Sequence, residues 1–130
     1  MTLATLIDTN IAIHLRDNDP AITTRITDLL ALPRLSILTR VELEGGVYAR
    51  PELAATRRAF IDLMLSQFPF LVFDRACVEA YRVIVGQCGF SRSRILDRMI
   101  AATAMAHDLT LITTDGEDFR TIPDLRLEIW

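Results

Sequence analysis

Short apolar runs alternate with longer segments of helical periodicity along this chain, and this alternation restricts its fold more than any other feature. Buried parallel strands typically read as continuous apolar runs. Such runs cover residues 3–7, 35–38, 70–73, 109–113 and 127–130. Strands that alternate with helices build βαβ units around a parallel sheet. The pattern therefore predicts an α/β chain, a three-layer α/β/α domain with a central, mainly parallel sheet of four to five strands.

Candidate capping residues mark where several helices begin. Asp19 precedes Pro20, which predicts an N-cap followed by proline at the first helical position. Thr39 and Glu42 have the spacing of a capping box, which predicts that a helix begins at Thr39. Asp74 is expected to cap a helix that runs towards residue 86.

The length and charge of the chain exclude several classes of function. A chain of 130 residues, 51% of them hydrophobic, suits a single domain over residues 1–130. All 14 basic residues are arginine, so there is no lysine for a P-loop or a Schiff base. The net charge of −3 excludes a simple basic coat for nucleic acids.

Cys77 and Cys88 fall on one expected helix, which argues against a disulfide. Eleven residues of helix separate them by roughly 16 Å along the axis, beyond the roughly 7 Å that a disulfide allows. We therefore expect reduced core cysteines in a cytoplasmic protein. No apolar run approaches the roughly 18 residues of a membrane span, and residues 1–8 lack the basic start of a signal peptide.

Acidic residues follow three of the expected elements at the same edge of the sheet. Asp8 comes directly after the first strand, and Asp115 follows the strand at 109–113. Glu42 lies four residues past Leu38, in the first turn of its helix. Because ligands of open parallel sheets bind beyond the carboxyl ends of the strands, we expect these three acids to gather there.

Asp97 is the fourth candidate acid, on an Ala-rich helix that Ser91 or Ser93 is expected to open and that ends near residue 107. Residues 99–106 are apolar almost all round, which predicts a buried helix. An ionised aspartate there needs a cationic partner, and Mg²⁺ or Mn²⁺ suits four converging carboxylates. Divalent ions in such a site are known to promote phosphodiester hydrolysis.

Each acid also has a purely structural explanation. Asp8 and Glu42 could act as helix caps, and Asp97 could interact favourably with the dipole of its helix. Asp115 precedes Gly116 and suits a turn. We favour metal binding, because helix capping does not require an acid directly after a buried strand, as at Asp8. Nor does it require one just before the apolar part of a helix, as at Asp97.

Four other polar residues are expected to take no part in metal binding or catalysis. Glu44 competes with Glu42 but is expected to be solvated, and Asp118 is expected to be a turn residue. His14 and His107 have no spacing typical of metal ligands, and the position of His107 at a helix end favours an interaction with the dipole.

Four motifs in order along nearly the whole chain resemble those of the PIN-domain ribonucleases. Their order and spacing are most similar to the VapC toxins of bacterial toxin–antitoxin pairs. No single motif is specific, but four in this order within 130 residues are. The motifs are an apolar strand ending in Asp8-Thr9-Asn10, Thr39-x-x-Glu42-Leu43, Asp97-x-x-Ile100-Ala101-Ala102-Thr103-Ala104, and Leu111-Ile112-Thr113-Thr114-Asp115-x-x-Asp118-Phe119.

The resemblance implies a PIN-like fold and an endoribonuclease that hydrolyses RNA with Mg²⁺ or Mn²⁺. It also implies a cognate VapB-like antitoxin and a homodimer. The chain departs from the family in having Ile95-Leu96 before the third acid, where Gly-Asp or Asn-Asp is often seen, and an aspartate as the fourth acid, where many relatives have asparagine. Neither departure removes a candidate ligand. By position the acidic-site roles fall to Asp8, Glu42, Asp97 and Asp115, with Asn10 as the small polar residue beside the first acid.

Three arginines lie at the start of the helix that carries Asp97, where a scissile phosphate is expected. Arginine binds phosphate through paired hydrogen bonds, so these residues are candidates for RNA contacts. A solvated cationic stretch explains them equally well. They are Arg92, Arg94 and Arg98.

Two other functions remain open at this point. A strand ending in Asp-x-Asn is similar to that of phosphatases with an aspartate nucleophile, but those have a second acid where this chain has Asn10. Receiver domains would in addition require a late lysine, which is absent. A catalytically silent PIN-fold binding module is the other alternative; it predicts the loss of some acids, whereas all four are present.

Overall fold

A five-stranded parallel sheet forms the middle layer of the protein, as the sequence predicts. The structure is a computed structural model that describes residues 4–130, so residue 3 of the expected first strand lies outside the described residues. Neighbouring strands are parallel throughout, in the order β3-β2-β1-β4-β5. The strands are β1 (Thr5–Ile7), β2 (Arg34–Ser36), β3 (Phe70–Leu71), β4 (Thr110–Thr113) and β5 (Leu127–Ile129).

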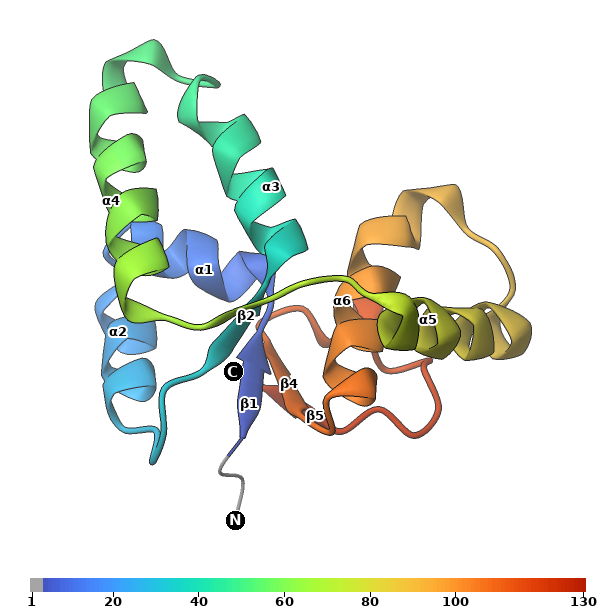
Figure 1. Ribbon diagram of the computed structural model, residues 1–130. Coiled ribbons are helices and arrows are strands. Elements are labelled where there is room, and N and C mark those ends of the chain that lie inside the picture. Colours follow the sequence, from blue (N-terminus) through green and yellow to red (C-terminus); the bar gives the residue numbers. More distant parts are fainter. Residues whose placement is uncertain (1–3) are drawn as a thin grey trace.

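Helices cover both faces of this sheet (Figure 1). Helices α1 to α4 lie on one side, and α5 and α6 lie on the other. The predicted α/β/α architecture is therefore confirmed. The helices are α1 (Thr9–Arg16), α2 (Pro20–Thr27), α3 (Ile37–Val47), α4 (Ala54–Gln67), α5 (Arg75–Cys88) and α6 (Ile95–Ala106), with the short 3₁₀ helices η1 (Pro51–Leu53), η2 (Arg92–Arg94) and η3 (Gly116–Asp118).

Alternation along the central strands divides the core into two clusters. Successive strand residues point to opposite faces of a sheet. Leu6 and Leu111 accordingly pack with side chains of α5 and α6, and Ile7 and Ile112 pack with side chains of α1, α3 and α4. All four are fully buried. Because both faces of β1 and β4 are covered, every residue of these two strands is buried, and only threonines interrupt their apolar sequences.

Two of the expected helix caps are confirmed. Asp19 accepts a hydrogen bond from the main-chain N–H of Ala21 at the start of α2, where Pro20 is the first helical residue. Asp74 accepts one from the N–H of Cys77 at the start of α5. These caps satisfy N–H groups that have no partner within the helix.

The expected capping box of Thr39 and Glu42 is wrong, because α3 begins two residues before Thr39. Ser36 is the N-cap, and its hydroxyl accepts a hydrogen bond from the N–H of Leu38 at 3.1 Å. Residues 37–38, expected in the strand, belong to the first turn of α3. Thr39 therefore lies within the helix, where its hydroxyl is free to contact a side chain of α1.

The expected cap of α6 at Ser91 or Ser93 is also wrong. The 3₁₀ helix η2 precedes α6, and Arg94 occupies the N-cap position without a side-chain cap. The hydroxyl groups of Ser91 and Ser93 instead lie 3.3 Å from each other. A 3₁₀ turn supplies main-chain hydrogen bonds ahead of a helix, so α6 begins without a polar cap.

Both cysteines lie on α5 and are free, as predicted. Cys77 is buried, and Cys88 is half-buried with its thiol 3.5 Å from the carbonyl oxygen of Thr121. Burial raises the pKa of the Cys77 thiol, which keeps it neutral. None of the helices within residues 4–130 combines the length and the apolar character that crossing a membrane requires.

Candidate active site

Asp8 stands at the carboxyl end of β1 and begins the helix α1. It is 3% exposed, and its Oδ1 accepts the N–H of Ile11 at 2.9 Å as the N-cap of α1. Its Oδ2 accepts the hydroxyl proton of Thr113, the last residue of β4. Burial raises the pKa of Asp8 above its ordinary value, although both hydrogen bonds lower it. The capping explanation for Asp8 is thus correct, and it coexists with the position expected for a ligand.

Glu42 reaches the same edge of the sheet from α3. Its Oε1 accepts a hydrogen bond from the Thr9 hydroxyl at 2.7 Å, which connects α3 to α1. Glu44, two residues on, instead forms a two-point ion pair with Arg58 of α4. Glu44 is partly exposed, which agrees with the expected solvated acid, although the sequence did not predict its ion pair with Arg58.

Asp97 enters from α6, on the other side of the sheet. Its pKa is raised to about 6, first by burial and then by the negative charges of Asp118, Glu42 and Asp8. Like charges repel more strongly in a partly dehydrated site, so Asp97 keeps its proton to a higher pH than an ordinary aspartate does. Acids from α1, α3, α6 and the segment after β4 therefore share one electrostatic environment.

Asp118 joins this group, although the sequence interpretation made it a turn residue. Burial and the nearby Asp115 carboxylate raise its pKa, and Asp118 in turn raises the pKa of Asp97. Asp115 and Asp118 are three residues apart across η3, and such side chains eclipse each other in a 3₁₀ helix. That spacing is the signal that could have identified Asp118.

Hydrogen bonds hold the segment after β4 in place. The N–H of Asp115 donates to the Thr113 hydroxyl at 2.9 Å, so Thr113 links Asp115 to Asp8. Gly116 allows η3 to lie against β5, because a Cβ atom there would be 2.4 Å from Cδ1 of Ile129. The placement of both acids thus depends on contacts to β4 and β5.

Positive charge is scarce around these five acids. Within residues 4–130, Arg94 is the one cation that forms an ion pair with any of them, at 3.7 Å from Asp118. No three His, Cys, Asp or Glu side chains of this part of the chain converge closely enough to hold a metal ion as they stand. The donor set nevertheless suits Mg²⁺ or Mn²⁺, because it consists of carboxylate oxygens whose charges go largely unbalanced.

The other expected site residues fall around the acids in different ways. Asn10 is exposed in the first turn of α1, beside Asp8. Arg92 is exposed at the start of η2. Arg98 is 6% exposed and donates to the carbonyl oxygen of Gly89, which ends α5. The candidate RNA contacts are therefore Arg92 and Arg94, whereas Arg98 holds the loop between α5 and α6.

Replacing Arg98 with methionine is expected to lower the free energy of unfolding by about 1–3 kcal/mol, because the Gly89 carbonyl loses its partner. Urea denaturation measures the change. Arg92→Met, at an exposed position, should stay within about 0.5 kcal/mol of the parent. Equal stability of the two variants would show that the buried contact is dispensable and would return Arg98 to the candidates for RNA binding.

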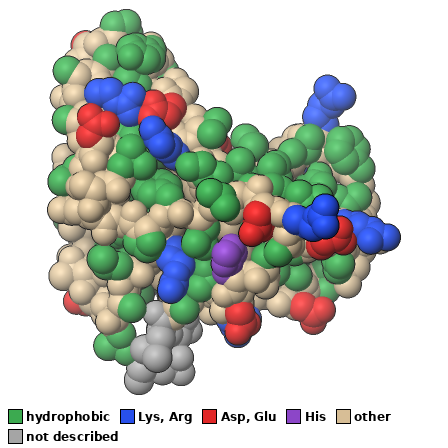
Figure 2. All heavy atoms as spheres, in the orientation of Figure 1, with side chains coloured by type: hydrophobic (Ala, Val, Ile, Leu, Met, Phe, Trp, Pro, Cys, Tyr) green, Lys and Arg blue, Asp and Glu red, His purple; other side chains and the backbone are tan. Residues whose placement is uncertain are grey.

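The face seen in Figure 2 is hollowed between two lobes. One lobe contains the α3–α4 hairpin and the other contains α5 and α6, and the β1 arrow points towards the hollow from below (Figures 1 and 2). Acidic and basic side chains are interspersed on this face. The carboxyl ends of the central strands, where the acids lie, are thus approached between the lobes.

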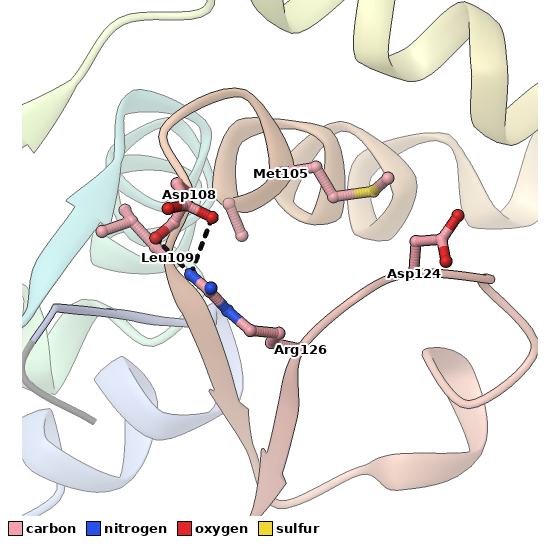
Figure 3. A pocket seen from close by; sticks show the side chains of 6 residues that line it. Met105, Asp108, Leu109, Asp124 and Arg126 are labelled. Atoms are coloured by element: carbon pink, nitrogen blue, oxygen red, sulfur yellow. Dashed lines mark hydrogen bonds and ion pairs between the residues drawn. The ribbon is translucent and has the colours of Figure 1, made fainter. Parts of the chain in front are cut away.

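A separate cavity of about 160 Å³ lies near the opposite end of β4 (Figure 3). Arg126 closes one side of it by donating to the carbonyl oxygen of Asp108 and pairing with the Asp108 carboxylate at 3.0 Å. Asp108 precedes β4, whereas Asp115 follows it. This cavity is therefore not part of the acidic site. It is lined by Ala104, Met105, Asp108, Leu109, Asp124 and Arg126.

Comparison with known proteins identifies the family. Among curated proteins, the chain is 35% identical over 97 residues to Ribonuclease VapC4 of Mycobacterium tuberculosis, covering 72% of this chain and 73% of that one. It is 28% identical to Ribonuclease VapC2 of Rickettsia felis, covering 96% of both chains.

Solved structures agree with these relatives. A crystal structure of VapBC2 from Rickettsia felis bound to a promoter DNA fragment has a TM-score of 0.86 at 24% identity and covers 98% of both chains. VapBC-1 from nontypeable Haemophilus influenzae has a TM-score of 0.79 at 28% identity, also over 98% of both chains. The PIN domain model matches residues 5–125. This chain belongs to the PIN domain family.

Proposed function

We propose that this PIN-domain protein is an endoribonuclease toxin of the VapC type that depends on Mg²⁺ or Mn²⁺. The observation that carries the proposal is the half-buried position of Asp97 near acids from three other segments, which also raises its pKa. A structural ion-pair network would have placed cations among these carboxylates. Relatives named VapC ribonucleases support the same activity.

The chain's own residues would perform three tasks. Asp8, Glu42, Asp97 and Asp115 would hold the ion, with Asp118 beside them. Thr113 fixes the orientation of Asp8 by donating to its Oδ2, and the cap to Ile11 fixes the other oxygen. Arg92 and Arg94 would bind backbone phosphates at the start of α6. A bound divalent ion supplies water activation and stabilises the charge of the transition state.

The proposed partner is a small antitoxin of the VapB type. Several solved neighbours are toxin–antitoxin complexes, among them VapBC structures from Rickettsia felis and Haemophilus influenzae. An antitoxin gene beside this one, and growth arrest relieved by its product, would support this assignment.

The nuclease proposal predicts cleavage of total RNA by the purified chain in Mg²⁺ or Mn²⁺, and none in EDTA. The matched variant Asp8→Asn should lose the activity, because one carboxylate charge is removed with little change of shape. Gel analysis of the RNA measures cleavage. Unchanged cleavage in EDTA, or by Asp8→Asn, would contradict the metal-dependent mechanism. No cleavage by the folded parent in either ion would favour the silent binding module.

A further inference from the structure

Two buried threonine hydroxyls form a chain of hydrogen bonds that ends on Glu42. The Thr39 and Thr9 hydroxyl oxygens lie 3.0 Å apart, and Thr9 donates to Oε1 of Glu42 at 2.7 Å. Thr39 is completely buried and Thr9 is 8% exposed. The chain connects α1 to α3, which pack against each other. Neither threonine is among the candidate ligands.

The number of hydroxyl protons determines which group donates in each of these hydrogen bonds. An ionised carboxylate only accepts hydrogen bonds, and a hydroxyl has one proton to donate. Because Thr9 gives its proton to Glu42, the proton between the two threonines must come from Thr39. Successive hydroxyls that donate in the same direction polarise one another, which strengthens the terminal bond to the carboxylate.

Packing alone does not explain these hydroxyls. Valine has nearly the shape of threonine and would fill a buried position without a polar group that needs a partner. A threonine inside a helix commonly bonds the carbonyl oxygen four residues earlier, as Thr103 does with Met99. Thr39 directs its hydroxyl across to Thr9 instead.

We propose that the hydrogen bonds from Thr39 through Thr9 position the Glu42 carboxylate. This inference rests on the proposed function, because it takes Glu42 to be a metal ligand. The chain holds Oε1 in one orientation before a cation arrives. Within residues 4–130, Oε2 has no hydrogen bond, so it is available for coordination. Partners of this kind orient metal ligands and reduce the entropy lost on binding.

The test compares valine and serine at each threonine, with Mn²⁺ alone as the probe. Thr9→Val should weaken Mn²⁺ binding, measured by titration calorimetry, by about 10–100-fold, the usual effect of losing an outer-shell partner. Thr39→Val keeps the direct bond to Glu42 and should weaken binding by roughly 3–10-fold. Thr9→Ser and Thr39→Ser keep the hydroxyl and should bind within about twofold of the parent.

A double-mutant cycle separates positioning from a merely structural role. If Thr9 acts through Glu42, adding Thr9→Val to Glu42→Ala should cause no further loss of Mn²⁺ affinity. RNA cleavage should show a lower kcat in the valine variants at saturating RNA, with KM for RNA unchanged. Thermal melting of each variant shows that it is folded.

The outcomes distinguish a failure of this positioning role from a failure of the proposed nuclease function. If Glu42→Ala binds Mn²⁺ and cleaves RNA as the parent does, the metal role of Glu42 is wrong. If Glu42→Ala loses affinity while both valine variants keep it, the positioning role is wrong and the nuclease proposal stands. If the serine variants lose as much affinity as the valine variants, the hydroxyls act through packing, and the inference is again overturned.

Discussion

The Asp97→Asn variant should lose RNA cleavage by at least about 10³-fold and yet melt at a higher temperature than the parent. The activity falls because one ligand charge is removed, and a loss of about 4 kcal/mol of transition-state stabilisation corresponds to that factor. The stability rises because asparagine avoids placing a charge in a half-buried site near Asp118, Glu42 and Asp8.

The sign and pH range of this gain follow from the pKa. Asp97 has a pKa of about 6 in the folded protein, against 3.8 for an ordinary aspartate. The folded state therefore binds the proton more tightly, and the contribution of Asp97 to stability decreases as pH rises from about 4 to about 6. Above that range, the folded parent must keep the unfavourable charge.

At pH 8 the variant should gain about 1–2 kcal/mol once solvent screening is allowed for, or roughly 3–8 °C in melting temperature. At pH 4 the gain should disappear. Calorimetry at both pH values measures it. Asp28→Asn, at the exposed end of α2, is the matched control and should change little at either pH. A variant that melts below the parent at pH 8 would contradict the repulsion inferred for Asp97.

Mg²⁺ or Mn²⁺ should stabilise the parent by an amount that grows with the logarithm of the ion concentration above its Kd. A ligand at about 100 times its Kd adds about 2.7 kcal/mol, which corresponds to roughly 8–11 °C here. Calorimetry with and without EDTA measures the shift. It should weaken as pH falls through about 6, because protons compete for Asp97. Monovalent salt at equal ionic strength separates coordination from charge screening.

The Asp97→Asn variant is the control for this second prediction. Its melting temperature should respond much less to the ion than that of the parent, because one of the ligands is missing. An equal response in both proteins, or none in the parent at millimolar concentrations, would show that the acids do not form the proposed site.

The sequence predicted the elements and four of the five acids because those depend on local patterns. Asp8 and Asp115 end apolar strands, and strand ends meet at one edge of a parallel sheet. Asp118 was missed because aspartate is common in turns. The orientation of the Asp118 side chain depends on how η3 lies against Ile129 of β5. That contact connects segments with no shared local signal.

The errors in helix starts and in the role of Arg98 have the same origin. Thr39 and Glu42 have the spacing of a capping box, but Thr39 contacts Thr9, thirty residues earlier in the chain. Arg98 resembles its neighbouring arginines in sequence, and only the position of Gly89 determines that it is buried. Spacing rules describe neighbours along the chain, whereas these side chains are oriented by distant ones.

Asp8 is both the N-cap of α1 and a proposed metal ligand, and this affects how mutants at this position must be interpreted. Its carboxylate caps α1 through Ile11, while its N–H donates to the carbonyl oxygen of Ile112 at 3.1 Å. An alanine there would remove the cap, at about 1 kcal/mol, so inactivity could reflect a frayed helix instead of lost chemistry. Asparagine caps helices about as well as aspartate does. The customary alanine scan would therefore mislead at this residue, whereas an amide in place of the acid keeps the helix start intact while removing the charge and the oxygen that accepts from Thr113.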